Sequence, residues 1–375
     1  MVVIKLRDFA LECYFGKYEF TAPYLLAQSD CESLSVRELL ALEPGSEQGF
    51  LDQWLGYTED RGDPELRRLV AGLYRRMDTD DVLMLCGAEE GILAYMNVML
   101  DAGDHAIVMY PNYPSAWEAV RAIPGCEWSE WRIRDDGERW VLDFDELERL
   151  IRPETKLVAV NTPNNPTGYT LTNAELRRLC ELCRAHDLWL FCDEVYKGLE
   201  LDGEKREWAA DLYDKALSLG VMSKAYGLAG LRVGWAVSKD HATLEKILRF
   251  KHYTSICDAA PAEYLSKVAL RHGETLLERN RSIIRDNLAA AERFFAAHRE
   301  LLSPRPPMAG PVAFPKLLAD MSADTFCDLA VTKKGVLLLP GSVYGVSGPY
   351  FRMGFGRKSF QDNFAKFEEF LTESF

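Results

Sequence analysis

The stretch LVAVNTPNNPTGYTLTNAELRRLCELCRAHDLWLFCD, residues 157–193, contains two short apolar runs on either side of a helical pattern. The runs at residues 157–161 and 188–193 have the length and the apolar composition of buried strands. Between them, residues 173–186 place apolar side chains along one face of a helix. A strand, a helix and a second strand in this order form a βαβ unit. The stretch therefore predicts a parallel sheet, with functional residues at the carboxyl ends of its strands.

The same alternation continues on both sides of this stretch. The pattern predicts further strands at residues 81–86, 105–109 and 216–223, and further helices at residues 64–76 and 89–100. A chain that alternates in this way builds a doubly wound sheet with helices on both faces. The sequence therefore predicts an α/β fold, in which residues 41–265 form a large domain around a mostly parallel sheet.

The C-terminal third has a different pattern. A long helical stretch from residue 263 to residue 299 precedes a proline-rich break at residues 303–307, and residues 360–375 are predicted to form a final helix. No flexible linker separates this part from the rest of the chain. We expect residues 266–375, together with residues 1–40, to form a smaller α+β domain packed against the large one.

The charge balance and the apolar pattern argue against several classes of protein. The 44 Lys+Arg and 58 Asp+Glu residues give a net charge of −14, which opposes binding to nucleic acid. No apolar run approaches the roughly 20 residues that span a bilayer, and Lys5, Arg7 and Asp8 come too early for a signal peptide. Nine cysteines, an odd number, indicate reduced thiols. We expect a cytoplasmic protein without a membrane or nucleic-acid partner.

Three segments that follow predicted strands carry the residues suited to chemistry. They are Asn161-Thr-Pro-Asn-Asn-Pro-Thr-Gly168, Asp193-Glu-Val-Tyr196 and Ser223-Lys224-Ala-Tyr-Gly-Leu-Ala-Gly-Leu-Arg-Val-Gly234. A lysine at a strand end has an easily shifted pKa, which suits it for a Schiff base. A carboxylate such as that of Asp193 can keep a pyridine nitrogen protonated. An amine and a carboxylate of this kind are what pyridoxal 5′-phosphate requires of a protein.

With these motifs the chain resembles a fold type I pyridoxal-phosphate enzyme of the class I/II aminotransferase family, whose best-known fold is that of aspartate aminotransferase. The resemblance covers residues 57–352. It implies that Lys224 forms the Schiff base with the cofactor and that Asp193 bonds the pyridine nitrogen. It also implies that Asn165 and Tyr196 bond the phenolic oxygen, and that Arg232 binds the phosphate.

Two further segments match cofactor-binding motifs of the family. Gly87-Ala-Glu-Glu-Gly91 opens a predicted helix and resembles the phosphate-binding turn, in which the backbone amides of Ala88 and Glu89 would face the anion. Tyr113, in Tyr110-Pro-Asn-Tyr-Pro114, matches the aromatic residue that stacks on the cofactor ring. The family commonly has Ser or Thr at the position of Val221, so Ser223 is the candidate for the missing phosphate bond.

The ends of the similar region carry residues for a partner subunit and for the substrate. Tyr57, in Tyr57-Thr-Glu-Asp-Arg-Gly-Asp-Pro-Glu-Leu-Arg67, matches a tyrosine that reaches the phosphate of the neighbouring subunit, which implies a homodimer with shared active sites. Arg352, in Phe351-Arg-Met-Gly-Phe355, matches the arginine that holds the substrate α-carboxylate, with Asn165 beside it. The N-terminal segments at residues 17–24 and 29–33 depart from the glycine-rich pattern of the family, so the side of the site that faces the substrate is unfamiliar.

The resemblance predicts transfer of an amino group between an α-amino acid and a 2-oxo acid. Lyases, β- or γ-replacement enzymes and specialised amino-acid synthases use the same cofactor residues and remain the alternative. A regulatory module that only binds the cofactor would usually bring a DNA-binding segment, which this acidic chain lacks. Cys180, Cys183 and His186 lie within a predicted amphipathic helix without a fourth ligand, so no metal site is predicted. The glycines at residues 227–234 lack a dinucleotide fingerprint.

Overall fold

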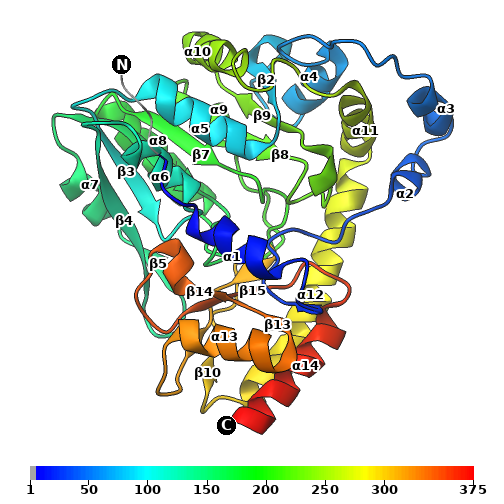
Figure 1. Ribbon diagram of the computed structural model, residues 1–375. Helices are drawn as coiled ribbons and strands as arrows, with labels where there is room; N and C mark the ends of the chain where they lie inside the picture. Colours follow the sequence, from blue (N-terminus) through cyan, green and yellow to red (C-terminus); the bar gives the residue numbers. More distant parts are fainter. Residues whose placement is uncertain (1–5) are drawn as a thin grey trace.

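The computed structural model describes residues 6–375, so Lys5 of the N-terminal charge pattern lies outside the described residues. Its largest element is an eight-stranded sheet (Figure 1). In spatial order the strands are β2 (Val82–Leu85), β9 (Gly234–Val237), β8 (Ala216–Val221), β7 (Trp189–Asp193), β6 (Thr155–Asn161), β3 (His105–Tyr110), β4 (Glu127–Asp135) and β5 (Trp140–Leu142). The five strands from β8 to β4 pair in parallel, and the outer strands pair antiparallel. The expected α/β fold with a mostly parallel sheet is confirmed.

Helices cover both faces of this sheet. Leu157 and Ala159 of β6 belong to one core, and Val158 and Val160 belong to the other, because successive side chains of a strand point to opposite faces. The first core includes α5 (Ala88–Met99), α6 (Ser115–Arg121) and α10 (His241–Lys251). The second includes α7 (Phe144–Leu150), α8 (Asn173–Ala185) and α9 (Ala209–Leu212). Apolar residues on both faces of one strand explain why the sequence shows continuous apolar runs.

Helix boundaries follow local capping residues. Thr172 and Glu175 form a capping box at the start of α8, where each side chain accepts a hydrogen bond from the other's backbone N–H. The helix α4 (Pro64–Ala71) ends five residues before its predicted end, with Gly72 as its C-cap. The stretch predicted as one helix at residues 263–299 is two helices, α11 (Ala260–Arg271) and α12 (Gly273–Ala297), which meet at a non-helical His272.

The C-terminal part of the chain packs below the large sheet in Figure 1, and α12, in yellow, runs down to it along one side. This part contains α13 (Ala323–Lys334), α14 (Phe360–Ser374) and the short strands β10 (Leu302–Ser303), β11 (Val312–Ala313), β12 (Lys316–Leu317), β13 (Val336–Leu337), β14 (Leu339–Pro340) and β15 (Phe351–Gly354). The N-terminal strand β1 (Tyr24–Leu25) pairs in parallel with β13. Two segments far apart in the sequence therefore share one layer.

The first helix of the N-terminal segment lies between the two parts of the molecule. The segment contains α1 (Ala10–Tyr18), α2 (Val36–Leu40) and α3 (Ser46–Leu51). In Figure 1, α1 lies beneath the large sheet and above the C-terminal part, and it contacts the short helix η3 (Gly341–Tyr344). Among residues 6–375, no helix combines the length and the apolar content that a membrane crossing requires.

Candidate active site

A cavity of about 250 Å³ opens at the carboxyl ends of β6, β7 and β8. The sheet register brings its polar walls together, since Asn161 at the end of β6 pairs with Asp193 at the end of β7. The predicted site residues that line this cavity are Ala88, Glu89, Tyr113, Asn165, Asp193, Tyr196, Ser223, Lys224 and Arg232. Residues spread over more than 140 positions of the sequence thus meet in one cavity, as expected for the strand ends of a doubly wound sheet.

Lys224 and Asp193 are the ionisable groups at the centre of the cavity. Burial raises the pKa of Asp193 to about 7, although a hydrogen bond from the backbone N–H of Val195 acts to lower this pKa. Burial likewise lowers the pKa of Lys224, whose Nζ donates to Ser29 Oγ at 3.0 Å. A lowered pKa increases the fraction of neutral amine, which is the form that attacks an aldehyde.

The turn before α5 has the features of an anion site. Gly87 takes a positive φ of 81° and places the free amides of Ala88 and Glu89 at the helix N-terminus. A Cβ on Gly87 would lie 2.5 Å from Arg232 Nη2, so the guanidinium occupies the space that a side chain would need. Arg232 Nη1 donates to Ser223 Oγ at 3.2 Å. Val221 lines the cavity with an apolar side chain, which leaves Ser223 as the hydroxyl beside Arg232.

Arg352 is hydrogen-bonded to Asn165, which lines the cavity. Asn165 Oδ1 accepts hydrogen bonds from Arg352 Nη1 at 3.1 Å and from Tyr344 OH at 2.9 Å. Arg352 Nη1 also donates to the hydroxyl of Tyr344. The carbonyl oxygen of Ala27 accepts from Nε at 2.9 Å and from Nη2 at 2.5 Å. Arg352 is only 1% exposed and forms no ion pair with a carboxylate of residues 6–375, so its charge is available to an anionic ligand.

The hydroxyl of Tyr196 is a buried polar group that points to a missing ligand. It lines the cavity, and within the described part of the chain it has no hydrogen-bond partner. A buried hydroxyl without a partner costs free energy, so such a group is expected to meet a ligand atom.

These groups fit pyridoxal phosphate. The amides of the α5 turn, Ser223 and Arg232 offer donors for a phosphate, and Asp193 offers a carboxylate for a protonated ring nitrogen. Asn165 and Tyr196 offer an amide and a hydroxyl that could bond a phenolic oxygen, and Lys224 offers an amine. The doubly wound sheet and this donor set define a pyridoxal-phosphate-binding α/β enzyme of the aspartate aminotransferase type.

The comparisons with known proteins agree with that class. The family model "Aminotransferase class I and II" matches residues 26–365, so the chain belongs to this family. The chain is 31% identical to the arginine–pyruvate transaminase of Pseudomonas aeruginosa, over 80% of this chain and 77% of the relative. It is 28% identical to the capreomycidine synthase of Streptomyces vinaceus, over 92% and 88% respectively.

Solved structures give the same result. A pyridoxal-phosphate-dependent aminotransferase from Streptococcus suis superposes with a TM-score of 0.91 and 30% identity, over 98% of each chain. A pyridoxal-phosphate-dependent cyclase, OrfR, superposes with a TM-score of 0.90 and 28% identity, also over 98% of each chain. The predicted family, cofactor and enzyme class are therefore confirmed, and the chain is a pyridoxal-phosphate-dependent enzyme of the aminotransferase family.

Tyr57 lies outside the cavity of its own chain. Its side chain is 84% exposed at the start of the segment that leads to α4. Within one chain, the structure therefore brings Tyr57 no closer to the other predicted site residues. A role at the phosphate requires a second chain, and the structure leaves that role a prediction.

Several residues at the site were not predicted from the sequence. Glu12 and Asp30 of the N-terminal segment line the cavity, and Ser29 contacts Lys224. Tyr344 of η3 donates to Asn165. No short motif surrounds these residues in the sequence, and only the packing of distant segments places them at the site. By contrast, Cys180 and Cys183 are buried in the core beneath β6 and β7.

Proposed function

We propose that this enzyme moves an amino group from an α-amino acid to a 2-oxo acid, with Lys224 as the group that carries the proton. The observation that supports this most is the shared cavity of Lys224 Nζ and the Asp193 carboxylate at the ends of β8 and β7. Pyridoxal phosphate, when bound, supplies an electron sink for the pair released at the substrate Cα. Lys224 then takes the Cα proton as a general base and returns it as a general acid.

The other residues of the cavity bind and orient the cofactor. Asp193 keeps the ring nitrogen protonated, while Arg232, Ser223 and the amides of Ala88 and Glu89, next to Gly87, hold the phosphate. Tyr113 packs on the ring face, and Asn165 and Tyr196 bond the phenolic oxygen. Their shared cavity and the unpartnered Tyr196 hydroxyl support these assignments.

Arg352 takes the substrate α-carboxylate. The support is a buried guanidinium that has neutral hydrogen-bond partners and no carboxylate partner in the described chain. A carboxylate accepts two parallel N–H donors from such a group, which fixes the direction of the Cα–H bond relative to Lys224. Asn165, hydrogen-bonded to Arg352, joins the carboxylate site to the cofactor site.

The active form is a homodimer. Large apolar side chains around Tyr57 face solvent in the single chain, with exposed fractions of 70% for Leu51, 79% for Trp54, 80% for Leu55 and 93% for Tyr253. Several large apolar side chains exposed in neighbouring segments are typical of a protein interface. Leu55 and Tyr57 also line a shallow groove with residues 257–261, so the patch joins two segments.

The domain division at residues 41–265 for the large domain, with residues 1–40 and 266–375 as the small one, is part of the same proposal. It is supported by the pairing of β1 with β13. A cytoplasmic location is supported by nine cysteines that all lie within residues 6–375 and form no disulfide there.

One experiment separates transfer from the alternative chemistry. Stoichiometric amino acid, added to the cofactor-loaded enzyme, should convert the cofactor to its amine form and release a 2-oxo acid without ammonia. Spectroscopy of the cofactor and an ammonia assay measure both outcomes, and a Lys224→Ala variant serves as the control that cannot complete the conversion. No conversion with any of the common amino acids would contradict the proposal.

Elimination, replacement or cyclisation is the second candidate. It is favoured by the synthase and cyclase relatives, which match this chain over 92% and 98% of its length. If ammonia or a product with an altered Cβ forms, and the cofactor stays in its aldehyde form, this candidate replaces the first.

A further inference from the structure

The N-terminal segment adds negative charge to the cavity. Glu12 of α1 and Asp30, which follows β1, line it together with Lys224. Both carboxylates act on the ammonium of Lys224 and oppose the lowering of its pKa by burial. The two acids therefore lie within electrostatic range of the reacting centre.

Most charges in and around the cavity have an opposite partner once the proposed ligands are counted. Asp30 already pairs with Arg357, through Oδ2 to Nη2 at 2.7 Å and Oδ1 to Nε at 3.2 Å. Under the proposed function, Arg232 faces the phosphate, Arg352 faces the α-carboxylate and Asp193 faces the ring nitrogen. Lys224 forms the covalent link.

Glu12 and Glu89 remain without a cation. Glu12 Oε1 accepts the hydroxyl of Tyr113 at 3.0 Å, and Glu89 Oε1 accepts the hydroxyl of Ser115 at 2.5 Å. Within residues 6–375, neither carboxylate has a lysine, arginine or histidine nitrogen within 4.0 Å. Burial raises the pKa of Glu89, and the charge of Glu12 raises it further. The two acids thus share one region of the cavity and repel each other.

A second feature connects this wall with the proposed cofactor site. Tyr113, which the proposed function places on the cofactor ring, is held by the hydroxyl bond to Glu12. The buried hydroxyl of Tyr196, without a partner among the described residues, lines the same cavity. Glu12 is an exposed residue that lines the same cavity as Lys224, so its carboxylate is open to a ligand in that cavity.

We infer that the preferred substrate is an amino acid whose side chain ends in a guanidinium or an ammonium group, and that Glu12 binds this cation. This inference rests on the proposed function, because it takes the α-carboxylate at Arg352 and the amine at Lys224 as fixed. A cation at Glu12 relieves the repulsion between Glu12 and Glu89 and forms a charge-assisted hydrogen bond. A neutral side chain of the same shape leaves the negative charge uncompensated and binds less well.

Pairs of amino acids with a charged and a neutral side-chain end test the inference. Arginine and citrulline have nearly the same shape, as do lysine and norleucine apart from the terminal group. We expect the wild-type enzyme to give a kcat/KM at least tenfold higher for the charged member of one pair, and the pair that shows it distinguishes guanidinium from ammonium. Equal values within both pairs would overturn the inference and leave transamination itself intact.

The variant Glu12→Gln removes the charge and keeps an acceptor for Tyr113. It should reduce the charged-to-neutral ratio of kcat/KM at least tenfold, whereas Glu300→Gln, an exposed glutamate beside Arg299 outside the cavity, should leave the ratio as it is. An equal loss for both members of a pair would show that Glu12 only supports Tyr113.

Binding of analogues that cannot react tests the proposed cation site separately from the proposed reaction. The analogues 5-guanidinopentanoate and 5-ureidopentanoate keep the carboxylate but have no amine to react. Calorimetry on the cofactor-loaded enzyme should show tighter binding of the guanidino compound, and Glu12→Gln should remove the difference. That result combined with no transamination would reject the proposed reaction and keep the cation site.

Discussion

Burial sets the ionisation of the groups at the centre of the cavity. Asp193 has a pKa of about 7 in the cofactor-free chain because its burial outweighs the hydrogen bond from Val195 and the positive charge of Lys224. A free aspartate titrates near pH 3.9, so the folded chain binds an extra proton between about pH 4 and pH 7. Under the proposed function, a protonated ring nitrogen beside Asp193 would add a positive charge and favour the ionised carboxylate.

The pH dependence of stability follows from that shift. The folded state binds more protons than the unfolded state in this window, so Asp193 stabilises the cofactor-free fold most at low pH, and this contribution is lost as the pH rises towards 7. Relative to Asp193→Asn, the free energy of unfolding of the wild-type apoprotein should fall by up to about 1.4 kcal/mol per pH unit. Denaturant unfolding of both proteins from pH 4 to pH 8 measures it, and parallel curves would contradict the prediction.

Arg352 gives a second prediction for a single residue. Arg352→Lys keeps the charge and loses the planar fork, which an ammonium cannot replace. A lost charged hydrogen bond costs about 1.5–3 kcal/mol, so kcat/KM for amino acids should fall roughly ten- to a hundredfold. Steady-state assays measure this loss, while the cofactor content should stay normal.

A decarboxylated amine is the control substrate for this variant. It has no carboxylate for Arg352, so the substitution should lower its reaction rate little. An equal loss for the amine and the amino acid would assign Arg352 to the structure around Ala27 and Asn165, to which it is hydrogen-bonded.

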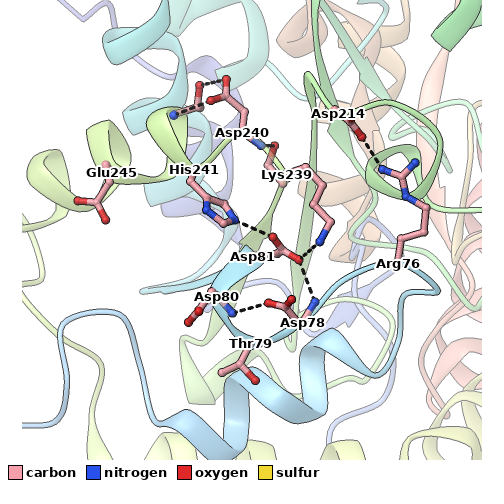
Figure 2. A network of polar contacts seen from close by, with 12 residues as sticks. Arg76, Asp78, Thr79, Asp80, Asp81, Asp214, Lys239, Asp240, His241 and Glu245 are labelled. Atoms are coloured by element: carbon pink, nitrogen blue, oxygen red, sulfur yellow. Dashed lines mark hydrogen bonds and ion pairs between the residues drawn. The ribbon is translucent and has the colours of Figure 1, made fainter.

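One element of the fold depends on a buried carboxylate. Asp81 ends the turn η1 (Thr79–Asp81) directly before β2 and is 1% exposed. Figure 2 shows that the Asp81 carboxylate accepts hydrogen bonds from Lys239, which follows β9, and from His241, the first residue of α10. The distances are 2.5 Å to Lys239 Nζ and 2.7 Å to His241 Nε2, so a single side chain joins a strand edge to the start of a helix.

The substitution Asp81→Asn tests this junction. Burial opposes ionisation of Asp81, but the hydrogen bonds from Lys239 and His241 outweigh it and lower the pKa. The ionised Asp81 therefore stabilises the fold above about pH 4, and this stabilisation is lost as the pH falls through the lowered pKa of Asp81. We expect a loss of about 2 kcal/mol in the free energy of unfolding at pH 7, and a smaller difference in acid.

The neighbouring Asp80 provides the control for this substitution. Its side chain is 88% exposed, so Asp80→Asn should change stability little. Thermal unfolding at several pH values measures both variants. A difference between wild type and Asp81→Asn that does not vary with pH would show that packing, not charge, holds the junction.

The assembled molecule should be a homodimer in which Tyr57 of each chain completes the other site. Sedimentation should give twice the mass of one chain. Leu55→Asp places a charge in the apolar patch, and it should produce monomers with weakened cofactor binding, because the phosphate then loses Tyr57. Leu318→Asp is the matched control, since Leu318 is 46% exposed and lies after β12, outside the patch. A monomer with full activity would contradict the shared site.

The sequence by itself determined the fold class and the family, and it predicted residues that the structure brings together in one cavity. Asn165, Asp193 and Lys224 could be predicted because each follows a recognisable apolar strand, and parallel strands end at one edge of the sheet. The ends of helices were less predictable from the sequence where capping or packing decided them. The break at His272, between two segments of equal helical pattern, is an example.

Only the tertiary structure decided which side chains surround the substrate. Glu12 and Tyr344 carry no local motif, and they reach the site because α1 lies between the two parts of the molecule and contacts η3. Such contacts depend on how distant segments pack, and no periodicity in the chain records that packing. The cavity residues at the strand ends are coded locally, whereas Glu12 and Tyr344 come together at the site from segments more than 300 residues apart.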